Sequence, residues 1–241
     1  MNKIYLIGSE GSIGSRYSSI IENDPMYRHL QLVKIDIKNQ GKDFYNLIKF
    51  EHEVENYFII ATPTVTHYDV INKILGLSCN CSHTKNYFLV EKPAFKHRIE
   101  YCALKGHFPE DLTNNIFMVN NLLHCSGLDH HYKEYVISYH SDKFGNEDLV
   151  SNLSQLIAYS RDIYSFKFWA EAGTYINFYA PSTHQKNGVN ITLNCSHVTE
   201  SYKAMLKNFI FEEQTNLYPF KELDDMFDKI EKFIEFYGLN K

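Results

Sequence analysis

The sequence predicts an α/β protein in two parts: a doubly wound parallel sheet over residues 1–123, followed by a smaller α+β part over residues 124–241 with a mostly antiparallel sheet. Two observations predict this division. In the first part, short apolar runs typical of buried strands alternate with segments whose apolar residues recur at helical spacing. In the second part, strand-like runs follow one another, and one of them, residues 189–196, alternates between apolar and polar side chains.

The first part contains the apolar runs that we expect to form the parallel strands. They span residues 4–7, 30–37, 57–61, 87–90 and 116–120. Helices are expected between them, one from residue 13 onward and others over residues 44–54, 65–76 and 97–105. Gly76 is well placed to end the third helix, because glycine readily adopts the left-handed conformation that closes many helices. In such folds, ligands bind at the carboxyl ends of the strands.

The second part consists mainly of strand-like runs between two helices. We expect the helices over residues 149–159 and 220–237 and the strands over residues 165–171, 174–179, 189–196 and 206–213. Asn187-Gly188 predicts a hairpin turn before the third of these strands. The last helix is amphipathic, since its apolar residues recur at three- and four-residue steps.

Composition and charge exclude several classes of protein. With 44% hydrophobic and 22% charged residues, the chain has the composition of an ordinary globular protein. Its net charge of −5 gives no sign of a nucleic-acid partner or of an anionic membrane. No apolar run approaches the roughly 20 residues of a membrane span, and no signal peptide precedes the first strand. We therefore expect a cytoplasmic protein.

The cysteines predict neither disulfides nor a metal site. The chain has 5 of them, and an odd number favours reduced thiols over a disulfide framework. Cys79 and Cys81 form a pair, but no second pair follows at metal-ligand spacing.

Glycines follow the first strand at Gly8, Gly11 and Gly14, immediately before and within the first helical pattern. In a strand, turn and helix of this kind, the first glycine permits the turn, the second lets the backbone approach a pyrophosphate, and the third lets the helix pack on the strand. The free amides at the helix start, which include those of Ser12 and Ile13, favour negative charge. The unit predicts a dinucleotide-binding Rossmann domain, although its GxxGxxG spacing departs from the commoner GxGxxG.

Asp36 lies near the end of the second apolar run, 22 residues after Gly14. An acidic residue at about this distance accepts hydrogen bonds from the ribose hydroxyls of NAD and repels the 2′-phosphate of NADP. The sequence therefore predicts NAD as the cofactor, while the nearby Lys38 leaves NADP as an alternative.

Two further segments follow strand ends, ATPTVTH at residues 61–67 and VEKPAF at residues 90–95. Together with the glycine turn, they resemble the glucose-fructose oxidoreductase / inositol dehydrogenase (Gfo/Idh/MocA) family, which shows a glycine-rich turn, a TPxxxH segment and an EKP tripeptide in this order. The resemblance covers residues 1–123, and the later elements match in order only. It implies a nicotinamide-dependent oxidoreductase acting on a sugar, a nucleotide-sugar or a cyclitol, and a homo-oligomer formed through the open face of the antiparallel sheet.

The resemblance also implies roles for individual residues. Lys92 would lie beside the nicotinamide and contact the reacting oxygen, and the Lys92–Pro93 bond is often cis in the family. Ala61, Thr62 and Pro63 would line the cofactor through their backbone, and Glu91 would also contact it. His67 would either face the cofactor or be a simple surface histidine.

The sequence departs from the family on the helix expected over residues 149–159. Family dehydrogenases carry an Asp and a His four residues apart there, but the corresponding positions hold Ser151 and Gln155, and Asp148 and Asn152 have the same spacing. Neither Gln nor Asn is a base near neutral pH. Either Lys92 works with another group, such as His124, or hydride transfer has been lost. Gln155 and His124 are the residues that we expect to bind substrate.

Two other interpretations stay open. A short-chain dehydrogenase would use Ser126, Tyr139 and Lys143, which match the Ser and YxxxK spacing of that class. A nucleotide-binding sensor or scaffold without turnover would explain the missing Asp and His.

Overall fold

The structure is a computed structural model of the 241-residue chain. It describes residues 1–79, 81, 84–119, 155, 158, 182–186, 189–193, 195–212, 214 and 217–236. The chain forms two compact units, one of Met1–Met118 with Pro219–Lys221 and one of Val119–Tyr218 with Glu222–Lys241. The predicted boundary at residue 123 lies outside the described residues and stays a prediction.

The first unit is built on a parallel sheet. Its strands are β1 (Lys3–Ile7), β2 (Gln31–Ile35), β3 (Glu55–Ile60), β4 (Lys85–Val90) and β5 (Ile116–Met118), and the sheet order is β2-β1-β3-β4-β5-β8, where β8 is Tyr218–Pro219. All neighbouring pairs from β2 to β5 are parallel, which confirms the predicted α/β fold with a doubly wound sheet. β2 and β3 flank β1 on opposite sides, so a topological switch point lies between β1 and β3.

Side chains that face each other across β1, β3 and β4 hold this sheet together. Phe58 stacks on Tyr5, with ring centroids 5.0 Å apart, and on Phe88, with centroids 4.9 Å apart. Such offset stacks add to the gain from burying the rings. Asn56 and Asn86, which are paired in register, are also buried, and the Asn56 amide donates to Asn86 Oδ1 over 2.9 Å.

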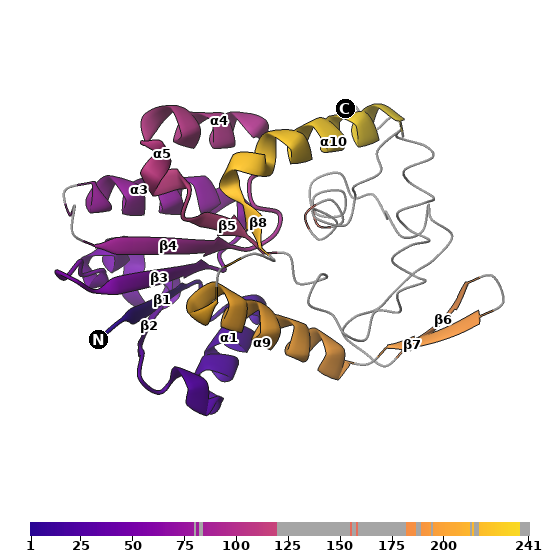
Figure 1. Ribbon diagram of the computed structural model, residues 1–241, viewed down its shortest axis with the longest axis horizontal. Helices are drawn as coiled ribbons and strands as arrows, with labels where there is room; N and C mark the ends of the chain where they lie inside the picture. The colour runs from indigo at the N-terminus through magenta and orange to yellow at the C-terminus, as the bar shows by residue number, and fades with distance from the viewer. Residues whose placement is uncertain are drawn as a thin grey trace. The chain divides into compact units, whose positions relative to one another are not determined.

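Helices cover both faces of the sheet (Figure 1). α1 (Ser12–Asn23) lies on one face, whereas α3 (His67–Ser78), α4 (Arg98–His107) and α5 (Glu110–Thr113) lie on the other. Shorter segments complete the unit: η1 (Pro25–Tyr27), α2 (Ile37–Gln40), η2 (Gly41–Leu47) and η3 (Thr64–Thr66). Because helices cover both faces, the central strands are buried and read as continuous apolar runs.

Two details of the first unit differ from the sequence prediction. The helix expected over residues 44–54 is wrong, because η2 ends at Leu47. The backbone of Lys49 then both donates to and accepts from the Tyr5 hydroxyl at 3.0 Å, which takes the chain away from a helical path. Gly76 does not end α3, which continues to Ser78 because the Cys79 amide still reaches the Leu75 carbonyl at 3.0 Å.

The described residues of the second unit include an antiparallel hairpin and the helices α9 (Cys195–Phe211) and α10 (Leu223–Phe236). β6 (Ser182–Lys186) pairs with β7 (Val189–Leu193), with Lys186 opposite Val189, as the Asn187-Gly188 pair predicts. After η5 (Phe220–Glu222), α10 (Leu223–Phe236) confirms the predicted amphipathic helix. Gln155 and Ala158 are helical, in agreement with the helix expected over residues 149–159.

The strand predicted over residues 206–213 is wrong. The segment belongs to α9 (Cys195–Phe211), in which Tyr202, Met205, Leu206 and Phe209 are buried. Their steps of three, one and three residues follow one helical face, whereas a short window around residue 209 shows only an apolar run. The strands expected over residues 165–171 and 174–179 lie outside the described residues, and the homo-oligomer stays a prediction.

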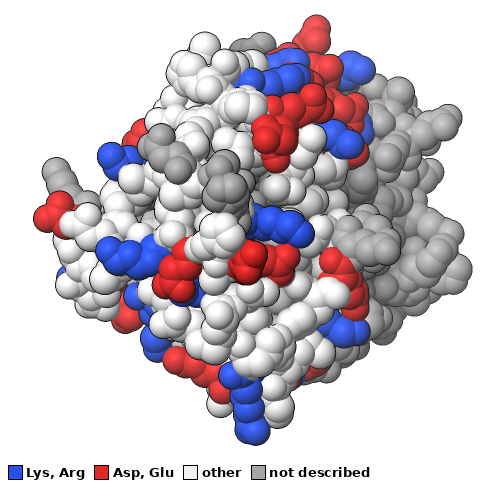
Figure 2. All heavy atoms as spheres, turned by 60° about the vertical axis from the view of Figure 1, so that its left-hand side comes forward, with Lys and Arg blue, Asp and Glu red and all other residues white. Residues whose placement is uncertain are grey.

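Basic and acidic side chains are interspersed on the face shown in Figure 2, in keeping with the small net charge of −5. In the described part of the chain, no helix is both long and apolar enough to cross a membrane. Cys79, Cys81 and Cys102 are free thiols, and the described residues contain no cluster of three or more His, Cys, Asp and Glu side chains suited to a metal ion.

Candidate functional site

The glycine turn between β1 and α1 is closely packed. Gly8 has a φ of +89°, a conformation that L side chains rarely adopt, and a Cβ at this position would lie 2.6 Å from the Ala61 carbonyl oxygen. A Cβ at Gly14 would lie only 1.9 Å from the Gly8 carbonyl oxygen. At Gly11 the nearest contact would be 3.3 Å. The outer two glycines are therefore required by the turn itself, and the middle one much less so.

The start of α1 offers backbone amides to a ligand. Gly11 is the N-cap, no side chain caps the helix, and its first turn contains no acidic residue. An α-helix leaves its first amides without intrahelical acceptors, and those of Ser12, Ile13 and Gly14 are in this position. The combination of a glycine turn and a neutral, uncapped helix start suits a negatively charged phosphate.

Asp36 is buried beside the glycine turn, with 6% of its surface exposed. Its carboxylate accepts hydrogen bonds from two backbone amides, that of Glu10 over 3.1 Å and that of Lys38 over 3.0 Å. These bonds fix the side chain and hold a negative charge next to the turn. Carboxylate oxygens have lone pairs for further donors, so the amides do not prevent the predicted contact with ribose hydroxyls.

The segments that follow β3 and β4 lie beside the glycine turn at the same edge of the sheet. The Ala61 amide donates to the Ile7 carbonyl over 2.8 Å, and the Glu91 amide donates to the Ile60 carbonyl over 3.0 Å. The strand ladders thus continue one residue beyond β3 and β4, into the segments that contain Thr62 and Lys92. Lys92 is half-buried, and the Lys92–Pro93 peptide bond is cis, as the family resemblance implies.

His67 links these two segments. Its side chain is 1% exposed, so the surface alternative for this residue is wrong. Nδ1 lies 2.9 Å from the Ala94 carbonyl oxygen and Nε2 lies 2.7 Å from that of Thr62. Burial lowers the pKa of His67, while the two carbonyl groups and the Glu91 carboxylate oppose this shift. The imidazole therefore lies between the segment after β3 and the segment after β4, and in its neutral form it donates its one N–H to one of the two carbonyl groups.

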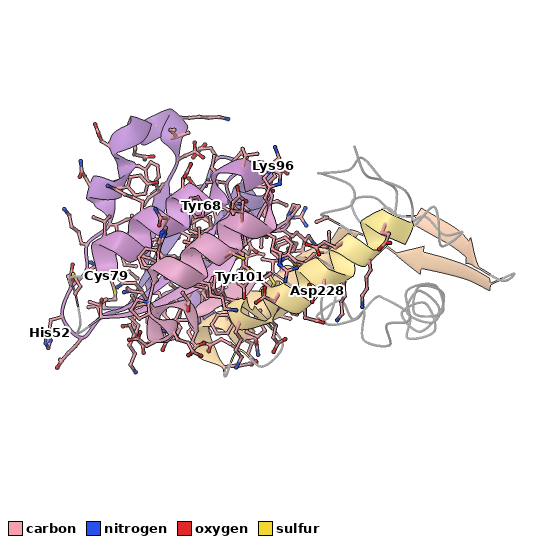
Figure 3. All side chains as sticks on the ribbon, turned by 90° about the horizontal axis from the view of Figure 1, so that it is seen from above. His52, Tyr68, Cys79, Lys96, Tyr101 and Asp228 are labelled. Atoms are coloured by element: carbon pink, nitrogen blue, oxygen red, sulfur yellow. The ribbon has the colours of Figure 1, made fainter. Side chains whose placement is uncertain are left out.

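Sequence reasoning missed Tyr17, which lies in α1. Its hydroxyl donates to Glu91 Oε1 over 2.6 Å in a buried hydrogen bond. The partners are 74 residues apart, and a tyrosine at a helical core position normally signals packing only. Beyond Glu91 the segment leads through Lys96, labelled in Figure 3, to α4, whose Glu100 carboxylate accepts from the Lys96 amide over 2.7 Å.

The remaining predicted residues are far from this edge in sequence. Gln155 is fully buried, and its amide donates to the Val119 carbonyl over 3.0 Å. His124 lies outside the described residues, as do Ser126, Tyr139 and Lys143 of the short-chain dehydrogenase alternative. Their roles stay predictions.

The parallel sheet, its switch point and the glycine turn define a Rossmann-like domain in an α/β protein. No model of a protein family matches the chain, and neither does any curated protein sequence. The structure is similar to the crystal structure of a myo-inositol dehydrogenase from Corynebacterium glutamicum ATCC 13032, with a TM-score of 0.51 and 13% sequence identity, over 96% of this chain and 94% of that one. The likeness supports the fold expected from the resemblance to the glucose-fructose oxidoreductase / inositol dehydrogenase family.

Gly14→Ala should destabilise the protein, because its Cβ would meet a backbone oxygen that cannot move without opening the turn. We expect the free energy of unfolding in urea to fall by about 2 kcal/mol or more. Gly76→Ala is the matched control: Gly76 is helical and exposed, a Cβ there meets nothing within 4 Å, and alanine should raise stability by roughly 0.4–1 kcal/mol. Equal stability of Gly14→Ala and wild type would contradict this view of the turn.

His67 should make stability depend on pH. Because its pKa is lowered from the ordinary 6.5, the unfolded chain binds this proton more tightly than the folded one. The contribution to stability is complete above pH 6.5 and is lost as the pH falls from there to the folded pKa, by at most about 1.4 kcal/mol per pH unit. Urea unfolding at several pH values should show this loss in wild type and less of it in His67→Gln.

His52→Gln is the control for this measurement, since 66% of the His52 side chain is exposed. The free energy of unfolding of His52→Gln should depend on pH as that of wild type does. A His67→Gln variant with the same pH dependence as wild type would show that another group is responsible.

Proposed function

We propose that this chain is an oxidoreductase that uses a nicotinamide dinucleotide and acts on a hydroxyl or carbonyl group of a sugar, a nucleotide-sugar or a cyclitol. The observation that carries the proposal is that the glycine turn, the backbone of residues 61–63 and the turn containing Lys92 follow adjacent strands at one edge of the sheet. The similar solved structure is that of a myo-inositol dehydrogenase, which supports the same class of reaction.

The residues around the glycine turn fit a dinucleotide. The space that a Cβ of Gly8 or Gly14 would fill is taken up by backbone, so the turn at the start of α1 is tight and carries no side chain at these two positions. Amides of Ser12, Ile13 and Gly14 would hold the pyrophosphate, and Asp36 would accept hydrogen bonds from the ribose hydroxyls. Ala61, Thr62 and Pro63 would line the site through their backbone.

Lys92 would act at the reacting oxygen of the substrate. The nicotinamide group, when bound, supplies the acceptor or donor of the hydride. An ammonium group at the turn after β4 can donate a hydrogen bond to a carbonyl or alkoxide oxygen and can exchange its proton with that oxygen. Glu91 and His67 would hold the turn in place around it.

A nucleotide-binding sensor or scaffold of the same fold is the second candidate. The observation that favours it is the environment of Gln155, which is fully buried with its amide bonded to the Val119 carbonyl. Its position corresponds to that of the proton-exchanging histidine in the family that the sequence resembles, and glutamine does not titrate. A sensor would bind the dinucleotide without changing the nicotinamide absorbance.

NAD should bind more tightly than NADP. The Asp36 carboxylate, fixed by two amides, would accept from the ribose hydroxyls of NAD and repel the phosphate of NADP. By calorimetric titration we expect a preference of at least about tenfold, which corresponds to about 1.4 kcal/mol. Asp36→Asn should reduce this preference for NAD over NADP. Equal or tighter binding of NADP to the wild-type protein would show that Asp36 does not face the ribose.

Lys92→Met should abolish most of the turnover, because methionine preserves the side-chain length but has neither charge nor proton. With a panel of cyclitols, sugars and nucleotide-sugars and absorbance of the reduced nicotinamide as readout, turnover should fall by about 10²–10⁴-fold. Calorimetry should show NAD affinity unchanged within about twofold, since the predicted contacts to phosphate and ribose come from other residues.

Lys96→Met is the matched control, because Lys96 is a half-buried lysine of the same connection between β4 and α4. It should keep turnover near that of wild type. NAD binding without turnover on any member of the panel would favour the sensor.

A further inference from the structure

The buried hydroxyl of Tyr17 connects α1 to the turn that follows β4. Tyr17 is 0% exposed, and its hydroxyl donates to Glu91 Oε1 over 2.6 Å. Hydrogen bonds from a hydroxyl to a carboxylate are short and strong because the acceptor is charged. The helix that begins at the glycine turn is therefore tied by one side chain to the residue before Lys92.

The Glu91 carboxylate also contacts the backbone of Lys92. Its side chain is 5% exposed, and while Oε1 accepts from Tyr17, Oε2 accepts from the Lys92 backbone amide over 3.1 Å. The backbone of Glu91 is fixed separately, through its amide and the Ile60 carbonyl at 3.0 Å. With one end of the carboxylate held by α1, its other end fixes the direction of the Lys92 amide, and so the direction in which the Lys92 side chain leaves the turn.

The far end of the same turn is held by His67. Its Nδ1 lies 2.9 Å from the Ala94 carbonyl oxygen, two residues after Lys92. His67 thus meets the backbone near Ala94, whereas the carboxylate of Glu91 accepts from the Lys92 amide itself. Tyr17 holds the other oxygen of that carboxylate.

We propose that Tyr17 is a positioning residue for Lys92, acting through Glu91. The catalytic consequence rests on the proposed function, whereas the effect on the Lys92 side chain does not. Without the hydroxyl, Oε1 loses a strong donor in a buried site, and the carboxylate turns toward other donors or water. The Lys92 amide then loses a fixed acceptor.

The test is Tyr17→Phe, which removes one oxygen atom and keeps the ring. Tyr5→Phe is the matched control, because Tyr5 is 1% exposed and its hydroxyl has two hydrogen bonds, both to the Lys49 backbone at 3.0 Å. The protein is treated with acetic anhydride, and mass spectrometry measures the rates at which Lys92 and Lys96 are acetylated. The readout is the ratio of the Lys92 rate to the Lys96 rate. We expect Tyr17→Phe to change this ratio at least about threefold, well within the factor that a hydrogen bond to a charged group is worth. Tyr5→Phe should leave it unchanged.

Equal ratios in the two tyrosine variants and in wild type would overturn the proposal. If Tyr17→Phe does not fold, Glu91→Met gives the same test, since methionine has about the length of glutamate but no oxygen that could accept from Tyr17 or from the Lys92 amide. An unchanged ratio in that variant overturns the proposal as well.

Turnover separates this proposal from the proposed function. If both hold, Tyr17→Phe lowers kcat about tenfold and leaves the NAD affinity within about twofold of wild type. If the labelling ratio changes but Lys92→Met retains full turnover, Tyr17 positions Lys92 and the proposed function is wrong. If Lys92→Met is inactive and the ratio is constant, the function stands and the positioning role is wrong.

Discussion

The parallel register of β1, β3 and β4 is the constraint on which the candidate site depends. Residues from segments that are distant in sequence become neighbours because each strand ladder runs on by one residue. The Ala61 amide reaches the Ile7 carbonyl, and the Glu91 amide reaches the Ile60 carbonyl. The turns that leave the three strands must then start side by side. The tight approach of Ala61 to Gly8 follows from this alignment.

Much of the first unit could be predicted from its sequence because the determinants are local. Apolar runs of strand length and glycines at fixed positions report on backbone conformation within a few residues, and the structure gives Gly8 and Gly14 a steric reason to be glycine. The buried carboxylate of Asp36 beside the turn likewise follows from its place after β2. These features needed no knowledge of distant contacts.

The features that could not be predicted from the sequence mostly depend on contacts between residues that are distant in the chain. Nothing within ten residues of Tyr17 indicates that its hydroxyl meets Glu91, and nothing near His67 indicates the Ala94 carbonyl. The error at Leu206 has a different origin, because its apolar neighbours fit a strand in a short window and a helix in a longer one. Lys49, which the sequence predicts to be helical, instead forms backbone hydrogen bonds with the distant hydroxyl of Tyr5.

The buried pair of Asn56 and Asn86 has a consequence for how the sheet avoids misalignment. The apolar side chains of β3 and β4 would be buried almost equally well in several strand registers, because the hydrophobic effect is not directional. If β4 slid by two residues so that Asn56 faced Phe88 instead of Asn86, the two amides would lose each other as partners, and a buried amide without a partner costs about 1–3 kcal/mol. The amide pair near the amino ends of the strands thus discriminates against slipped sheets. By doing so it decides which loops meet at the opposite end.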